Sequence, residues 1–326
     1  MEATSTTNSS SSTPTSSSLR WKILRRALLR KHSSVPDDHS DMGLNRVSRK
    51  ATQGFNLIPR LIVDDHSGEP SDTLLSRNTL LGSSKDAFLC YKLPIHNSPY
   101  IRLCQRVDDG ADLNDFEVCN RHNIDNTGLV CLWPSEDVLA YYSLSNTDMF
   151  RDKRVIELGS GYGLAGLVIA VVTEALEVVI TDGNPQVVDY IQQSIEANSG
   201  AFGGSQVKSM VLHWNHPEKI DMLNSFDIIV ASDCTFFKEF HKDLARTIRM
   251  LLKKKSSSEA ILLSPRRGDS LDKFLLEIEN FGLQFTVTEM YNSEVWRLHE
   301  NFMDGDESWP NYDKDHCYPL LVRITL

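Results

Sequence analysis

A glycine-rich turn between two short apolar runs constrains this chain more than any other feature. Residues 154–182 read RVIELGSGYGLAGLVIAVVTEALEVVITD. A β-branched run ends at the turn, an apolar run of helical length follows, and a second β-branched run ends on Asp182. This order predicts the first strand, helix and strand of a nucleotide-binding sheet, in which glycines let backbone N–H groups approach a ligand closely.

The turn is compatible with two cofactors. Gly161 to Gly166 has the spacing G-x-G-x-x-G, and Asp182 follows about 20 residues later, as in dinucleotide-binding units. An overlapping acid-x-G-x-G-x-G pattern is formed by Glu157, Gly159, Gly161 and Gly163. That pattern suits S-adenosylmethionine, which carries a positive sulfonium and no phosphate. Because a carboxylate at the strand end would repel a pyrophosphate by roughly 1 kcal/mol or more at about 4 Å, we favour the methyl donor over a nicotinamide dinucleotide.

Composition and charge exclude several other classes of protein. With 40% hydrophobic residues, the 326-residue chain can bury one large core. Its longest apolar run, Leu164–Val172, is too short for stable membrane insertion, and its six cysteines show no disulfide or zinc spacing. The net charge is −10, but residues 1–60 carry +6 and the remainder carries −16. This asymmetry argues against nucleic-acid binding by the main domain.

The N-terminal region differs from the rest. Residues 1–18 are mostly Ser and Thr, so we expect a disordered tail. The basic segment Arg20–Lys31, with Trp21, Leu24 and Leu28 at helical spacing, predicts an amphipathic helix. It could be part of an organelle transit peptide, bind a membrane surface or calmodulin, or pack its apolar side on the main domain.

Beyond this segment the chain predicts two further parts. Residues 19–125 form an α+β accessory region, with strands at 87–93 and 100–107 joined by a turn. Residues 126–326 alternate strands with helices, which predicts an α/β, Rossmann-like sheet that is mostly parallel and covered by helices on both faces. The last two apolar runs, 284–290 and 318–326, lack an obvious crossover helix between them, so the last of seven strands should be antiparallel.

Several motifs together resemble a known family. They are Trp133-Pro134-Ser135-Glu136, the glycine turn, Asp182-Gly183-Asn184, Leu212-His213-Trp214, Ala231-Ser232-Asp233-Cys234-Thr235-Phe236 and Pro265-Arg266-Arg267-Gly268. In this order they resemble the seven-β-strand protein-lysine methyltransferases, and among these the branch that methylates calmodulin. The resemblance covers roughly residues 19 to 326. It implies an S-adenosylmethionine-dependent enzyme, monomeric and cytoplasmic or also nuclear, that methylates a lysine of calmodulin.

The resemblance also implies a role for each motif. On the donor side, cofactor contacts are expected from Trp133, Glu157, Gly159, Ser160, Gly161, Gly163, Asp182, Trp214, Ala231 and Ser232. Asp182 would accept hydrogen bonds from the ribose hydroxyls, and Trp214 would pack beside the adenine. The catalytic pair would be Asp233 and Phe236, at the entrance of a lysine channel. Many relatives have Tyr at the second position, so Phe236 lacks the hydroxyl that could orient the amine.

Each of these residues also has an ordinary structural interpretation. Trp214 could be a rim aromatic, Trp133 could fill the core, and Asp233 could cap the following helix. An acidic enzyme that binds acidic calmodulin needs positive charge at the interface. We expect this charge from Arg20–Lys31, from Lys253–Lys255 or from the pair Arg266-Arg267. A nicotinamide-dependent oxidoreductase, a methyltransferase for another protein lysine and a non-enzymatic calmodulin-binding protein remain the rival functions.

Overall fold

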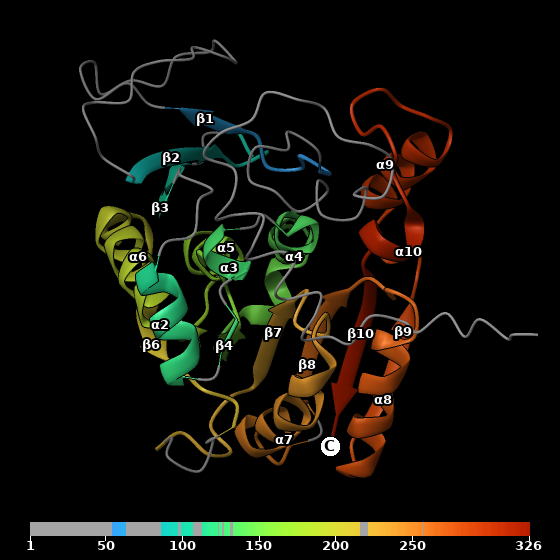
Figure 1. Cartoon of the computed structure of the whole chain (residues 1–326). Helices are drawn as coiled ribbons and strands as arrows, with labels where there is room; N and C mark the ends of the chain where they lie inside the picture. Colours follow the sequence, from blue (N-terminus) through green and yellow to red (C-terminus); the bar gives the residue numbers. More distant parts are fainter. Residues whose placement is uncertain are drawn as a thin grey trace, which may run out of the picture.

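The fold is seen in a computed structural model of the whole chain (Figure 1). The residues that it describes are 54–62, 86–96, 99–106, 113–122, 124–125, 127–130, 133–215, 221–255 and 257–326. The predicted disordered tail and the predicted basic helix at Arg20–Lys31 lie outside the described residues.

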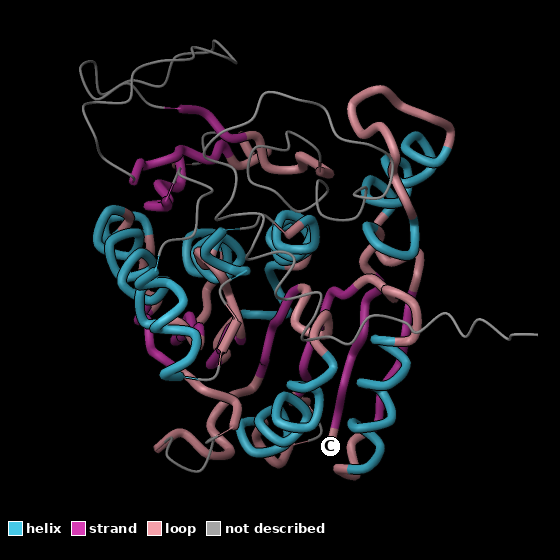
Figure 2. Tube along the Cα trace, viewed as in Figure 1, coloured by secondary structure: helices cyan, strands magenta, loops and turns pink. Residues whose placement is uncertain are grey.

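A seven-stranded sheet forms the centre of the molecule (Figures 1 and 2). In chain order its strands are β4 (Arg154–Leu158), β5 (Glu177–Asp182), β6 (Gln206–Val211), β7 (Ile228–Ser232), β8 (Glu259–Ser264), β9 (Gln284–Thr288) and β10 (Leu320–Thr325). The spatial order is β6-β5-β4-β7-β8-β10-β9. Strand β10 pairs antiparallel with β8 and β9, and the other pairs are parallel. The predicted mostly parallel sheet with an antiparallel last strand is therefore confirmed.

Helices cover both faces of this sheet. They are α3 (Thr127–Val130), α4 (Pro134–Ser145), α5 (Leu164–Val172), α6 (Pro185–Ala197), α7 (His241–Leu251) and α8 (Ser270–Asn280). Figure 1 shows α4, α5 and α6 on one face and α7 and α8 on the other. Because both faces are covered, the central strands β4 and β7 are apolar along nearly their whole length, and Val155, Ile156 and Ile229 are fully buried.

A small antiparallel sheet packs outside the α5–α6 layer. It consists of β1 (Arg60–Ile62), β2 (Asp86–Lys92) and β3 (Tyr100–Arg106), and α2 (Leu113–His122) follows it. The predicted strands at 87–93 and 100–107 thus form an antiparallel pair. Strand β3 is tied to the end of α6, because the Arg102 and Cys104 backbone N–H groups donate to Asn198 Oδ1 and Ser194 Oγ at 2.9 and 2.8 Å.

The expectation that no helix separates the last two strands was wrong. Helices α9 (Ser293–Met303) and α10 (Lys314–Cys317) connect β9 to β10. Helix α9 reads SEVWRLHENFM. Its overall composition is polar, but Val295, His299 and Phe302 lie on one face of the helix and are buried. Asn292 caps it by accepting from two backbone N–H groups. None of the described helices is long and apolar enough to cross a membrane.

Candidate active site

The predicted turn lies where the order of the sheet reverses. Strand β4 has β5 on one side and β7 on the other, so the carboxyl ends of these strands open a crevice at their shared edge. Gly159, Gly161 and Gly163 have φ of 59°, 55° and 79°, in the left-handed region that favours glycine. A Cβ on Gly159 would lie 2.8 Å from Cys234 Sγ and 2.9 Å from the Trp214 ring. Only a bare backbone fits there.

Two carboxylates occupy the amino end of α5. The Leu164 N–H donates to Glu136 Oε1 at 3.2 Å, and the Gly166 N–H donates to Glu157 Oε2 at 2.8 Å. These first-turn N–H groups are the ones that hold a pyrophosphate in dinucleotide-binding proteins. Burial, together with the nearby Glu136, holds the pKa of Glu157 well above its usual value. The backbone N–H groups of Leu164 and Gly166 are therefore already hydrogen-bonded to the protein's own acidic side chains.

Asp182 ends β5 and faces the crevice. Its Oδ1 accepts from the Asn184 N–H at 2.8 Å and its Oδ2 accepts from the Gly161 N–H at 3.1 Å. Burial raises the pKa of Asp182 to about 7, although these N–H groups act in the opposite direction. Because each carboxylate oxygen can accept more than one hydrogen bond, Asp182 retains the capacity to bind hydroxyl groups of a ligand.

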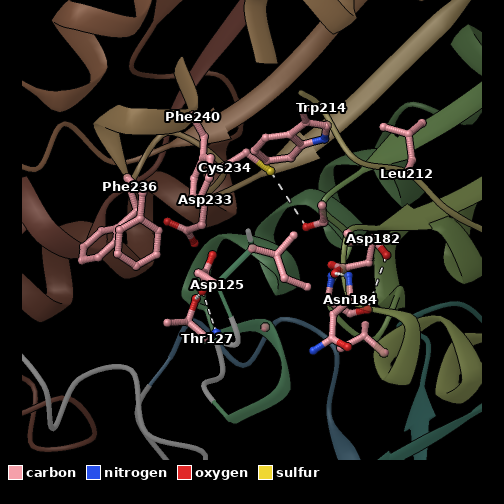
Figure 3. Close-up of a pocket in the computed structure, with 18 of the residues that line it drawn as sticks. Asp125, Thr127, Asp182, Asn184, Leu212, Trp214, Asp233, Cys234, Phe236 and Phe240 are labelled. Atoms are coloured by element: carbon pink, nitrogen blue, oxygen red, sulfur yellow. Dashed lines mark hydrogen bonds between the residues drawn. The ribbon is translucent and has the colours of Figure 1, made fainter. Parts of the chain in front are cut away.

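A cavity of about 330 Å³ extends from this turn to the end of β7 (Figure 3). Figure 3 shows Asp182 and Asn184 at one end, Asp233 and Phe236 at the other, and Trp214 and Cys234 along the wall between them. The described residues that line it include six acids and no Lys or Arg; the acids are Asp125, Glu136, Asp182, Asp233, Glu239 and Asp243. Such a lining favours a cationic ligand and disfavours a phosphate.

Trp214 forms part of the cavity wall between its two ends. Its indole is half-buried beside Gly159, and the ring of Phe240 meets it edge-on with the ring centres 6.3 Å apart. The Trp214 carbonyl also accepts from the Thr247 hydroxyl on α7 at 3.3 Å, which fixes the loop after β6. The indole face can thus stack on an aromatic ligand in the cavity.

The other end of the cavity is built around Asp233. This residue follows β7 with φ of 54°, and its Oδ2 accepts from the Ser135 N–H at the start of α4 at 3.1 Å. Its Oδ1 lies 2.5 Å from the guanidinium of Arg267. The rings of Trp133 and Phe236 stand beside the carboxylate, 5.1 Å apart and tilted by 56°. Because α7 begins at His241 and its N-cap position is Phe240, Asp233 does not cap the helix that follows it; its carboxylate instead binds the amino end of α4.

The structure brings most of the predicted site residues to one cavity. Its wall contains Trp133, Gly159, Ser160, Gly161, Asp182, Trp214, Ser232, Asp233 and Phe236. Three predicted donor contacts are not among the lining residues. Glu157 turns away toward α5, Gly163 packs against Ile180 of β5, and Ala231 is fully buried within β7. These three residues belong to the predicted motifs, but each of them packs in the protein core and does not face the cavity.

The predicted surface role of Arg266-Arg267 was wrong for its second member. The Arg267 side chain is only 6% exposed, because it ion-pairs with Asp233 and lies over two aromatic rings. Arg266 is exposed. Lys253, another candidate for surface charge, ion-pairs with Asp227 at 2.5 Å, whereas Lys254 and Lys255 are exposed.

Several wall residues had no role in the sequence interpretation. The acids Asp125, Glu239 and Asp243 come from three different elements, so no local pattern shows that they converge. His213 also lines the cavity, and its ring stacks on that of His122 with the ring centres 5.2 Å apart. The only signal for Arg267 was its place in a family-like motif, which gave no hint of burial. In the described part of the chain, no cluster of His, Cys, Asp and Glu could hold a metal ion.

The chain was then compared with known proteins. The sequence model of the lysine methyltransferase family matches residues 119–281. An Arabidopsis thaliana protein named calmodulin-lysine N-methyltransferase is 62% identical over 96% of this chain and 98% of its own length. A Xenopus tropicalis protein named protein N-lysine methyltransferase METTL21A is 27% identical over 52% of this chain and 74% of its own. A Mus musculus protein named protein-lysine N-methyltransferase EEF2KMT is 25% identical over 54% of this chain and 56% of its own length.

Proposed function

This chain belongs to the lysine methyltransferase family, and on that premise we propose that it transfers methyl groups from S-adenosylmethionine to a lysine side chain of calmodulin. The protein substrate is proposed because the similar Arabidopsis thaliana protein carries that name and the match spans nearly the full length of both chains. A lysine of another protein is the alternative, because the more distant relatives are named as protein-lysine methyltransferases without calmodulin in the name.

One observation supports the choice of donor more than any other. The cavity is lined by six carboxylates, and two of the first N–H groups of α5 are already bound to Glu136 and Glu157. A pyrophosphate would meet like charges and no free first-turn donor at Leu164 or Gly166. A ligand with a sulfonium and an ammonium gains from the same acids. The rival nicotinamide-dependent reaction therefore lacks its phosphate site.

The donor-side residues fit the parts of this ligand. The bare backbone at Gly159 and Gly161 leaves room for the methionyl chain, and Asp182 has the acceptor capacity for two ribose hydroxyls. The Trp214 indole offers a stacking face for the adenine. When bound, S-adenosylmethionine supplies a methyl group on a positively charged sulfur, which leaves as a neutral thioether once the methyl is transferred.

At the other end the residues must prepare the acceptor. A free lysine has a pKa of about 10.4, so it has to release its proton to water before the nitrogen lone pair can attack the methyl carbon. Trp133 and Phe236 would surround the aliphatic stem and exclude water. Asp233 would accept a hydrogen bond from the neutral amine and so orient its lone pair toward the methyl group. The ring faces of Trp133 and Phe236 would also stabilise the alkylammonium product by cation–π attraction.

Methyl transfer can be tested directly. The protein would be incubated with labelled S-adenosylmethionine and unmodified calmodulin, and the label would be mapped by mass spectrometry. We expect label on a lysine of calmodulin and none when that lysine is replaced by arginine. Binding of NADH but not of S-adenosylmethionine would reject the donor; label on other proteins but not on calmodulin would reject only the substrate.

The electrostatics of the complex give a weaker and separate proposal. The chain outside residues 1–60 carries a charge of −16, so we propose that the basic segment Arg20–Lys31 steers an acidic substrate. Reversing four of its charges should lower kcat/KM about fivefold at low ionic strength and little at high salt. A loss that does not depend on salt would contradict steering.

A further inference from the structure

The buried Arg267 is not among the residues that line the cavity, yet it lies directly against three groups of the proposed lysine slot. Its guanidinium carbon lies 5.0 Å from the ring centres of both Trp133 and Phe236, and one of its nitrogens lies 2.5 Å from Asp233 Oδ1. These three groups are the ones that the proposed function assigns to the acceptor lysine. An internal cation therefore lies behind the slot, in contact with the groups that form it.

This placement is held by the fold. Arg267 and Asp233 both adopt left-handed backbone conformations, with φ of 47° and 54°, which non-glycine residues rarely adopt. The Arg267 N–H donates to the Asp315 carbonyl at 2.8 Å, and the Gly268 N–H donates to the Asp315 carboxylate at 2.7 Å. Asp233, directly after β7, is held by its own N–H, which donates to the Leu263 carbonyl of β8 at 3.0 Å. Both partners are thus fixed at the same edge of the sheet.

We propose that Arg267 is a positioning residue that balances the charge of Asp233, so that the slot binds its lysine as a neutral amine. This inference rests on the proposed function. A carboxylate close to an amine favours the ammonium form and raises the amine pKa by about 1 to 3 units, which is the wrong direction for methyl transfer. A fixed guanidinium on the same carboxylate cancels this effect. Asp233 then remains a hydrogen-bond acceptor without acting as a counter-ion for the substrate.

Other titratable groups surround the slot and have to be considered. They are Glu136 on α4, Cys234 after β7, Lys238 and Glu239 on the 3-10 turn before α7, His241 and Asp243 on α7, Arg266 and Asp269 before α8, and Asp315 and His316 on α10. Burial lowers the pKa of His241 and raises that of Cys234 well above its usual value. Both shifts favour the neutral form of the group, so burial opposes a change of charge at either residue while the substrate amine titrates.

The test is the pH dependence of single-turnover methylation of calmodulin between pH 7 and 10, measured with saturating S-adenosylmethionine. In Arg267→Met the unpaired carboxylate should move the midpoint of the profile to higher pH by about one unit, which lowers the rate at pH 7.5 about tenfold. Arg267→Lys should restore the position of the profile because it restores the charge. Asp233→Asn should shift the midpoint to lower pH, whatever its maximum rate. The double variant, with both charges removed, should return it to the wild-type position.

These outcomes separate charge balance from a purely structural role. A uniform loss of rate at every pH, with no shift in any variant, would overturn the proposal. A gain of activity at neutral pH in Arg267→Met would also overturn it, because Arg267 would then be a plug that must leave before lysine enters. If Arg267→Met does not fold, as judged by thermal denaturation, the Asp233→Asn variant decides: a midpoint at lower pH supports the proposal, and an unchanged midpoint overturns it. Absence of methyl transfer by the wild-type protein would instead reject the proposed function.

Discussion

The two ends of the cavity handle charge in opposite ways. Around the glycine turn, Asp125, Glu136 and Asp182 line the cavity, and the described lining residues include no Lys or Arg. At the end of β7, Asp233 is paired with the buried Arg267. One end is therefore suited to a ligand that arrives with a permanent positive charge, and the other to a group that must be uncharged when it reacts.

This difference follows from the chemistry of methyl transfer. A sulfonium keeps its charge until the methyl group leaves, so nearby carboxylates stabilise its binding. A lysine has to lose its proton first, and an unbalanced carboxylate would oppose that loss. If the comparison is correct, changes at one end should affect donor affinity, and changes at the other should affect turnover.

Removal of the carboxylate at the end of β7 should have the largest effect. In Asp233→Ala the amine loses its acceptor and its orientation, so kcat should fall by about 100-fold or more while the Kd of S-adenosylmethionine changes less than about twofold. Steady-state kinetics and calorimetric titration measure the two quantities. Asp272→Asn, on the exposed side of α8, is the control. Full turnover in Asp233→Ala would remove this residue from the mechanism.

The reverse pattern is expected at the glycine turn. In Gly159→Ala the new methyl group would overlap Cys234 and Trp214, so the affinity for S-adenosylmethionine should fall by about 10- to 100-fold. Gly203→Ala is a matched control, because Gly203 has φ of 56° but no neighbour within 4 Å of an added Cβ. Both variants carry the same backbone strain. Equal donor affinity in the two variants would show that the ligand does not lie against Gly159.

The next effect concerns the pH dependence of donor binding. Asp182, with a pKa of about 7, is largely protonated at pH 6 and ionised at pH 8. If the ionised form binds the ribose hydroxyls and the cation, affinity is nearly full at pH 8, about half at pH 7, and about tenfold lower at pH 6 than at pH 8. Asp182→Asn should bind weakly and equally at both values, whereas Asp189→Asn, on exposed α6, should behave as wild type. A wild-type affinity that is constant from pH 6 to 8 would contradict this assignment.

The smallest change is expected along the wall between the two ends. In Trp214→Leu the stacking face is lost while apolar bulk is retained, so the affinity for S-adenosylmethionine should fall about 2- to 10-fold with little change in kcat. Methylthioadenosine, which has the adenine but not the amino-acid part, should lose affinity by a similar factor. A loss for the full donor alone would place the indole away from the adenine.

The amount that could be predicted differs between the two ends. The glycine turn and the acid at the end of β5 lie within one strand-turn-helix-strand unit, so spacing alone indicated both. The residues around Asp233 come from distant parts of the chain: Ser135, which binds it, is 98 residues away in sequence. Helix α9 was missed for a related reason, since its apolar face is recognised only against the core that it covers.

The sequence by itself determined the mostly parallel sheet and the position of the turn, because periodicity and glycine conformation act over neighbouring residues. The antiparallel last strand was predicted correctly, but from a missing helix that the structure contains as α9 and α10. The sequence also indicated which acids end the strands. Only the tertiary structure decided that Glu157 points away from the cavity and that the buried Arg267 pairs with Asp233. Burial and charge pairing depend on how separate strands align at one edge of the sheet, and no local pattern in the chain encodes that alignment.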